Sequence, residues 1–329
     1  MRFSLTDDQQ LMGKAVRELL ERECGPEALR AAWDGGGRVP GAWQRLAELG
    51  VLALLVPSER GGMGGDEVDV VPLLEEAGRV ALGEPLIGTL AAVSVVDRDW
   101  STRIASGDAV VAVGAGPGDL VADAEVADLL LLERDGALYA MPRDAVTVEP
   151  ATAVDTAARL ARVTWESTGA TRLDAEPDDV FDRAALDASA QLVGVAQGML
   201  DMAVRYAKER EQFGKPIGSF QAVKHQLADV YIGIEFARPV VLRAAWSVAR
   251  SLPSRGRDVS HAKHAATEAA QRAARVALQV HAGIGYTYEH DLHMWLKRAW
   301  TLAALYGTAS WHRARVARAV LDERQARVP

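Results

Sequence analysis

Apolar residues recur at helical spacing through the first ninety residues of the chain. Thr6 is a suitable N-cap, and the acidic residues after it fit the first turn of a helix. Further helices are expected over residues 40–49 and 68–82. The glycine-rich stretch 59–65 predicts a loop, because it lacks the spacing and the ending of a phosphate-binding P-loop.

The pattern changes between Ala109 and Trp165. Short apolar runs, separated by Gly, Pro and Asp at about ten-residue spacing, predict a compact and mostly antiparallel sheet. Within this region Arg134-Asp-Gly136 predicts a hairpin turn. The expected strands are 110–113, 129–132, 138–141, 146–148 and 160–165.

Long helices dominate the chain after Asp178. Helical stripes predict a first helix after Asp178, a second from near Gln221 and a third over residues 261–280. Gly283 and Gly285 are expected to end the third helix by taking positive φ angles. Two more helices, over residues 291–305 and 308–324, complete the chain.

This order of elements predicts an α+β fold that is mostly α. We expect an N-terminal helical domain over residues 1–100 and a small β domain over residues 101–177. A C-terminal helical bundle is expected over residues 178–329.

Composition narrows the function only a little. With 329 residues, 49% hydrophobic and 25% charged, the chain resembles an ordinary globular protein. A net charge of -8 argues against nucleic acid as a partner, and the single Cys24 excludes an intrachain disulfide and CxxC metal chemistry. Neither a signal pattern nor a membrane-spanning run is evident, so a cytoplasmic location is expected.

The segment Arg210-Glu-Gln-Phe-Gly-Lys-Pro-Ile-Gly-Ser-Phe-Gln221 carries the most specific chemistry. The guanidinium of Arg210 presents donors that suit a pyrophosphate. The phenyl ring of Phe213 offers a stacking face, and the Gln221 amide suits an adenine or ribose edge. These residue types together indicate a dinucleotide contact.

Three segments resemble the acyl-CoA dehydrogenase family, in family order and over nearly the whole chain. The first is the segment just described. The second is Gln279-Val-His-Ala-Gly-Ile-Gly-Tyr, similar to a Gln-x-x-Gly-Gly-x-Gly-Tyr segment of the family, with Ala282 in place of the first glycine. The third is Pro57-Ser-Glu-Arg-Gly-Gly-Met-Gly in the N-terminal helical region.

The resemblance implies the acyl-CoA dehydrogenase fold and FAD as cofactor, shared across a subunit interface. It implies that one set of residues reaches the adenosine and pyrophosphate of a flavin seated mainly in the neighbouring subunit. The residues in the matching positions are Arg210, Phe213, Gln221, Gln279 and Gly283.

The other half of the family's site is missing. The family's β domain carries a Thr-Glu-Pro-x-Ala-Gly-Ser-Asp-like loop and a Trp-containing loop at the flavin ring, whereas residues 113–119 lack the Thr and Ser donors. The β region is also shorter than the family's. Tyr306 and Ala184 occupy the two positions where the family places its catalytic glutamate, so no catalytic residue is assigned.

Several other residues have two interpretations. Glu268 is a possible relocated base, although helical neighbours of opposite charge favour an exposed ion pair. His281 either faces a phosphate of the ligand or only packs within the loop that follows the third long helix. His225 and Asp229 are spaced i,i+4, but no third ligand is evident, so no metal site is expected. An arginine-rich C-terminal segment is either a solvated face or an attractor of CoA phosphates.

These observations favour one interpretation and leave two alternatives. The chain resembles the short subunit of heteromeric α2β2 acyl-CoA dehydrogenases of bacterial steroid side-chain degradation. It would work on an acyl-CoA with a longer homologue that carries the base. The alternatives are a flavin-free protein of this fold with a structural, lyase or cyclase role, and a homotetrameric dehydrogenase with a relocated base.

Overall fold

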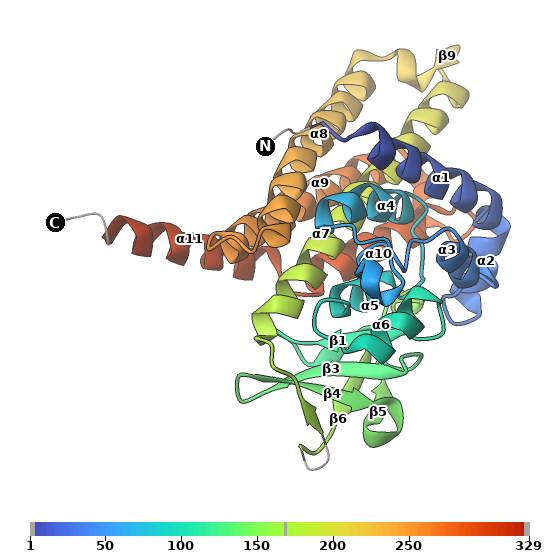
Figure 1. Cartoon of the computed structure of the whole chain (residues 1–329). Helices are drawn as coiled ribbons and strands as arrows, with labels where there is room; N and C mark the ends of the chain where they lie inside the picture. The colour runs from blue at the N-terminus through green and yellow to red at the C-terminus, as the bar shows by residue number, and fades with distance from the viewer. Residues whose placement is uncertain (1–3, 168–169, 326–329) are drawn as a thin grey trace.

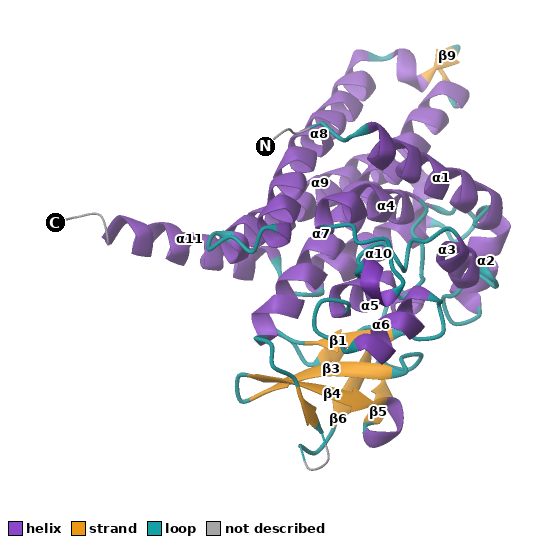
Figure 2. Cartoon of the chain, viewed as in Figure 1, coloured by secondary structure: helices purple, strands orange, loops and turns teal. Residues whose placement is uncertain are grey.

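A computed structural model describes residues 4–167 and 170–325 of the chain (Figure 1). Helices from both ends of the sequence form the body, and the strands lie together at one end of the molecule (Figure 2). This architecture is the predicted one, an α+β fold that is mostly α. The bundle helices project on the side opposite the two sheets, where a short hairpin of β8 (Glu211–Gln212) and β9 (Lys215–Pro216) lies (Figure 1).

The N-terminal part is helical, as predicted. Thr6 and Gln9 form a capping box at the start of the first helix, and Asp66 with Asp69 forms another at α4. The helices are α1 (Asp7–Glu23), α2 (Pro26–Asp34), α3 (Ala42–Glu48), α4 (Glu67–Arg79), α5 (Leu86–Ala92) and α6 (Arg98–Ala105). Helix α6 crosses residue 100, where the sequence predicts a domain boundary; the three-domain division stays a prediction.

The middle part contains two small sheets, in the strand orders β1-β3-β4-β7 and β2-β6-β5. Their pairings are antiparallel except for β1 with β3, which are parallel. Asp135 and Gly136 turn the β3–β4 hairpin with φ of 53° and 72°, which confirms the predicted turn. The strands are β1 (Val111–Gly114), β2 (Leu120–Val121), β3 (Leu129–Arg134), β4 (Ala137–Pro142), β5 (Thr147–Pro150), β6 (Ala161–Thr164) and β7 (Thr171–Arg172). The two-residue strands β2 and β7 were not predicted, because they are too short to show alternation.

The C-terminal part is a bundle of long helices. The predicted elements are present, although the third begins at Arg255 and not at 261, because its first turns are polar and show no apolar period. The helices are α7 (Pro177–Glu209), α8 (Gln221–Ala249), α9 (Arg255–His281), α10 (Leu292–Ala304) and α11 (Ala309–Gln325). The outer part of α11 extends away from the body (Figure 1).

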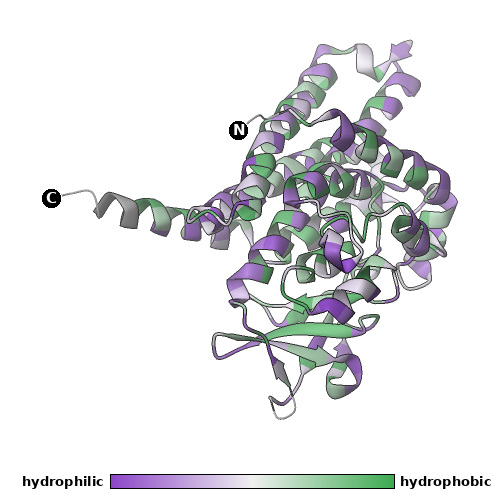
Figure 3. Cartoon of the chain, in the orientation of Figure 1, coloured by the Kyte–Doolittle hydropathy of each residue, from purple (hydrophilic) through white to green (hydrophobic). Residues whose placement is uncertain are grey.

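Helix α7 is the central element of the molecule. Its 33 residues span about 50 Å and are buried along most of their length. Gly194 and Gly78 let α7 and α4 touch, since a Cβ at Gly194 would lie 1.9 Å from the Glu75 carbonyl oxygen. Helix α7 therefore connects the strand end of the molecule to the hairpin end. Apolar segments gather where α7 meets its neighbours and along β3 (Figure 3).

Buried ion pairs attach the sheets to the helices. Arg159 donates to the Gly36 and Gly83 carbonyls at 3.0 and 2.6 Å and pairs with Asp123. Arg298 of α10 lies 3.1 Å from the carboxylate of Asp155. Because removing one partner of a buried pair leaves an uncompensated charge, these contacts hold the small β region against the N-terminal part, at Gly36 and Gly83, and against α10 of the bundle.

Within the described residues, none of the helices combines the length and the apolar character needed to cross a bilayer.

Candidate functional site

The predicted dinucleotide segment forms a compact hairpin between α7 and α8. Strand β8 (Glu211–Gln212) pairs with β9 (Lys215–Pro216), and Phe213 and Gly214 make the turn with φ of 51° and 74°. Two backbone hydrogen bonds fix its base: Arg210 N–H donates to the Tyr206 carbonyl, and Ile217 N–H donates to the Arg210 carbonyl, both at 2.8 Å. The hairpin therefore holds its side chains on a rigid support.

The key side chains of this hairpin point outward. Phe213 is 92% exposed and meets the edge of Phe220, with 6.2 Å between ring centroids. Arg210 and Gln221 are exposed, and neither side chain has a hydrogen bond or ion pair within residues 4–167 and 170–325. A non-glycine residue at positive φ carries backbone strain, which accumulates at ligand-contacting sites. The arrangement suits a ligand that approaches from outside the chain.

The second predicted segment follows the end of α9. Gln279 and Gly283 are exposed, and a Cβ added to Gly283 would meet nothing within 4 Å. The expectation that Gly283 and Gly285 take positive φ is wrong. The turn falls on Ala282, with φ 53° and ψ −136°, one residue earlier than expected and at the position where the family has a glycine.

The last turn of α7 joins these two segments. Tyr206, whose carbonyl anchors Arg210, stacks on His281 with 4.5 Å between ring centroids. His281 also meets His290 at 4.4 Å and is 1% exposed, so it fills the loop and does not face a phosphate. Burial lowers the pKa of His281, and its Nδ1 donates to the Ala277 carbonyl at 2.8 Å. A neutral ring therefore packs behind the glycine segment.

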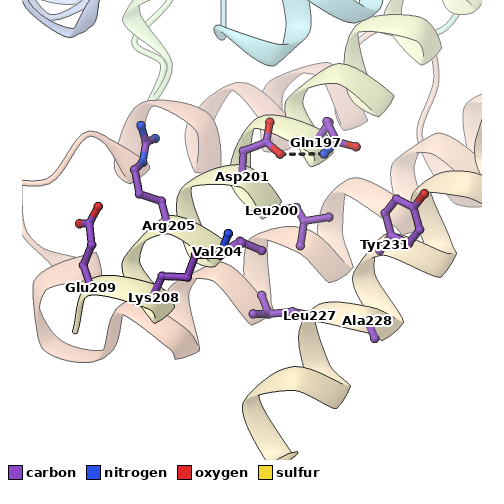
Figure 4. A pocket seen from close by; sticks show the side chains of 10 residues that line it. All are labelled: Gln197, Leu200, Asp201, Val204, Arg205, Lys208, Glu209, Leu227, Ala228 and Tyr231. Carbon is purple, nitrogen blue, oxygen red and sulfur yellow. Dashed lines mark hydrogen bonds between the residues drawn. The ribbon is translucent and has the colours of Figure 1, made fainter. Parts of the chain in front are cut away.

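A groove runs beside the hairpin between α7 and α8 (Figure 4). Its volume is about 630 Å³, with Leu227 and Tyr231 of α8 on one side and Arg205 and Lys208 of α7 on the other. Asp201 lies on α7 one turn before Arg205, farther from the hairpin, and accepts a hydrogen bond from Gln197 at 2.9 Å. Cations thus lie on α7 beside the hairpin that presents Arg210.

At the opposite end of α7, neither of the two positions where the family places its catalytic glutamate carries a carboxylate. Ala184 is fully buried, and Tyr306 is 8% exposed with φ 54°. Burial raises the pKa of Tyr306, and the charges of Asp123 and Asp187 raise it further. The phenol therefore stays protonated at neutral pH and cannot replace a glutamate as a base.

Buried polar groups hold the backbone around Tyr306. Lys263 of α9 donates from Nζ to the carbonyls of Leu305 and Gly307 at 2.9 and 3.1 Å. His312 donates from Nε2 to the Tyr306 carbonyl at 2.8 Å. Burial lowers the pKa of Lys263 to about 7. Lys263 was not predicted as a buried residue, although a lysine within an alanine-rich stripe indicates a buried amine.

A cavity of about 380 Å³ opens between the sheet and α10. Leu120, Val154, Trp300 and Tyr306 line it, together with residues 117–119. The neighbouring Gly116 N–H donates to the carboxylate of Glu133 at 3.0 Å. Thr152, Thr301 and Tyr306 contribute hydroxyl groups to its lining, whereas the loop of residues 113–119 carries none.

The remaining candidates lie on the surface. Glu268 is exposed on α9, as expected, but it forms no ion pair within the described residues. His225 and Asp229 are also exposed, and in the described part of the chain no group of three or more potential ligands could hold a metal.

The fit to FAD therefore differs between the two ends of the cofactor. The adenosine and pyrophosphate of FAD suit an exposed guanidinium, an aromatic face, amide groups and uncrowded backbone. This chain offers all of these, from Arg210, Phe213, Gln221, Gln279 and Gly283. At the other end, the loop before the cavity supplies no hydroxyl donors.

Comparison with known proteins defines the class. A model of the acyl-CoA dehydrogenase N-terminal domain matches residues 6–97, and one of the acyl-CoA dehydrogenase C-terminal domain matches residues 179–321. The chain belongs to the acyl-CoA dehydrogenase family, a family of FAD-dependent oxidoreductases.

Individual relatives agree with this assignment. The acyl-CoA dehydrogenase IpdE2 of Mycobacterium tuberculosis is 36% identical over 301 residues, which cover 89% of this chain and 91% of that protein. A solved ChsE4-ChsE5 complex from the same organism has a chain that is 25% identical, with a TM-score of 0.85 and complete coverage of both chains. Butyryl-CoA dehydrogenase from Megasphaera elsdenii shares the fold, with a TM-score of 0.87 at 20% identity, over 98% of this chain and 100% of that one.

One further relative bears on length. The alignment with the probable acyl-CoA dehydrogenase YngJ of Bacillus subtilis runs over 388 positions and covers 98% of this chain and 100% of that protein, at 28% identity. Because this chain has only 329 residues, it lacks residues that the longer relative contains.

Proposed function

We propose that this chain is a subunit of a heteromeric acyl-CoA dehydrogenase that binds the adenosine–pyrophosphate end of FAD seated mainly in a longer partner. The enzyme would introduce an α,β double bond into an acyl-CoA, with a fatty or steroid-derived acyl group. We infer a cytoplasmic location for the complex.

The exposed and unpaired hairpin carries this proposal. Arg210 is a charged donor without an internal partner, and Phe213 exposes almost its whole ring at a strained backbone position. A surface of this kind is stabilised when a ligand or a neighbouring subunit covers it. The similarity to a chain of the ChsE4-ChsE5 complex supports a heteromer of two related subunits.

The test is to express the chain alone and together with a longer family member encoded beside it. We expect a stable complex with an oxidised-flavin absorption spectrum and acyl-CoA oxidation, whereas this chain alone should be colourless. A yellow, active protein from this chain alone would contradict the heteromer. A stable complex without flavin would favour the flavin-free alternative.

Arg210→Ala in the complex tests the contact itself. We expect flavin to dissociate at least tenfold more readily, because a charge-assisted pyrophosphate contact contributes about 1.5–3 kcal/mol. Arg45→Ala is the matched control, since Arg45 is an exposed arginine on α3, outside the predicted FAD contacts. Equal flavin retention by the two variants would remove Arg210 from the site.

A further inference from the structure

Helix α8 exposes an apolar stripe on the side that faces away from the bundle. Phe236 is 74% exposed and Ile232 is 50% exposed, and the half-buried Val240 continues the stripe. Their four-residue spacing places the three side chains on one face of the helix. The opposite face, with Ile234 and Val241, is buried against the rest of the chain. Because α8 is apolar on both sides, a second surface is expected to cover the outer one.

This outer stripe is separate from the groove beside the hairpin. Leu227 and Tyr231 line the groove from the side of α8 that faces α7 (Figure 4). Phe236 follows Tyr231 by five residues, which corresponds to a rotation of about 140° around the helix axis. A molecule that covers the outer stripe therefore leaves the groove and the predicted FAD contacts open.

A glycine with open space around it lies beside the outer stripe. Elsewhere in this chain, glycines within helices allow two helices to touch. A Cβ added to Gly78 would lie 2.1 Å from the Gln191 carbonyl oxygen. One added to Gly198 would lie 2.3 Å from the Arg79 carbonyl oxygen. A Cβ added to Gly233 would meet nothing within 4 Å in the described residues. Since glycine destabilises a helix relative to alanine, its presence at this exposed position suits the close approach of another helix.

Opposite charges end the outer stripe at equal distances from its centre. Asp229 lies seven residues before Phe236, and Arg243 lies seven residues after it. Asp229 is exposed and has no hydrogen bond or ion pair within residues 4–167 and 170–325. Arg243 pairs with Asp258 through one Nη at 3.2 Å, and a guanidinium has further donors for a second carboxylate. The stripe is therefore complementary in charge to its own antiparallel copy.

We propose that two copies of this chain associate through the outer stripes of their α8 helices, which cross antiparallel with a two-fold axis at Phe236. A two-fold interface pairs one surface with itself, so Phe236 meets the same residue of the second copy. Ile232 of each copy then packs on Val240 of the other. Gly233 of each copy lies beside Pro239 of the other and lets the two helices come close. The two exposed ends are joined by ion pairs between the aspartate of one copy and the arginine of the other.

The pairing goes beyond the proposed function and does not require flavin. It leaves the hairpin free for the longer subunit, so a heteromer of this kind contains two copies of this chain. The association of the chain is therefore measured without flavin, and the copy number in the complex is measured by native mass. A chain that pairs in this way while the complex lacks activity would reject the proposed function and keep this inference.

Phe236→Cys locates the two-fold axis. A residue on the axis meets its own copy, so mild oxidation of the full chain should give a disulfide-linked dimer of this chain. Tyr231→Cys, an equally accessible site on the groove side, should stay unlinked, and the native Cys24 is buried. The same result is expected in the complex with the longer homologue. Absence of the linked dimer, or equal linking in the two variants, would overturn the proposal.

Gly233→Leu separates association from folding. Because the space around Gly233 is open within the chain and leucine favours a helix, the melting temperature should stay unchanged or rise. The added side chain holds the two helices apart, so the dissociation constant of the dimer in sedimentation experiments should rise at least tenfold. Ala228→Leu adds similar bulk on the groove side and should leave it unchanged. Association of Gly233→Leu as tight as that of the wild type, or a single copy of this chain in the complex, contradicts the pairing.

A charge exchange tests the antiparallel register. Asp229→Lys places a lysine beside Arg243 of the second copy, and we expect the dissociation constant to rise by about two- to tenfold. Asp229→Lys combined with Arg243→Glu restores opposite charges across the interface and should recover most of the loss. A double variant that associates more weakly than Asp229→Lys alone would overturn this register.

Discussion

The ring of Tyr206 stacks on the ring of His281, with 4.5 Å between their centroids. This contact joins the end of α7, from which the hairpin of Arg210 continues, to the end of α9, from which the glycine segment continues. Two segments that are about 70 residues apart in the sequence are thereby held at one end of the bundle. Their relative position depends on an aromatic pair that touches no predicted ligand.

Tyr206→Ala should weaken both the fold and flavin retention. Removing the ring deletes the stack on His281 and leaves space beneath the glycine segment, which we expect to lower the free energy of unfolding by about 2–4 kcal/mol. Urea unfolding of the chain and flavin release from the complex measure the two effects. Tyr206→Phe keeps the ring and should behave like the wild type; equal losses in the two variants would assign the effect to the hydroxyl.

Phe213→Ala should separate binding from stability. Because Phe213 is 92% exposed, the free energy of unfolding should change by less than about 1 kcal/mol. Flavin should nevertheless dissociate faster from the complex if the ring stacks on the cofactor. Measurements of melting temperature and flavin release check this pair of outcomes, and unchanged flavin release would exclude Phe213 from the site.

Ala282→Gly should stabilise the chain. Ala282 has φ 53° and ψ −136°, a region that suits glycine and strains residues with a Cβ. Relief of this strain outweighs the added freedom of the unfolded chain, so we expect a gain of roughly 1 kcal/mol in urea unfolding. Gly283→Ala, where φ is not positive and no atom crowds the Cβ, is a control for backbone entropy alone. A lower stability of Ala282→Gly would show that the turn is not strained.

Lys263 should make stability depend on pH. Its pKa falls from about 10.5 in the unfolded chain to about 7 in the folded one, so the unfolded state binds more protons between these values. The free energy of unfolding of the wild type, relative to Lys263→Met, should therefore rise with pH from about 7 to 10. The slope should reach at most about 1.4 kcal/mol per pH unit. Urea unfolding of both proteins at several pH values measures it. A difference that is independent of pH would mean that the carbonyls of Ala303, Leu305 and Gly307, which all accept from Lys263 Nζ, keep the buried amine charged.

The sequence by itself determined the order of helices and sheet, because apolar periodicity reports which face of each element is buried. It also placed the Arg210–Gln221 segment between two long helices, although its hairpin, with Phe213 at positive φ, appeared only in the structure. The Tyr306 and Ala184 substitutions were equally visible, because they are identities at single positions.

Only the tertiary structure decided what surrounds each polar residue. Periodicity did not indicate that Lys263 reaches three carbonyls, or that Oδ2 of Asp187 is buried without a hydrogen-bond partner in the described residues. The position of the glycine turn was also misplaced by one residue, since backbone dihedrals follow the packing of His281 against Tyr206 as well as local preference. Desolvation and hydrogen bonding depend on residues distant in the sequence, so they become visible only once the helices are packed.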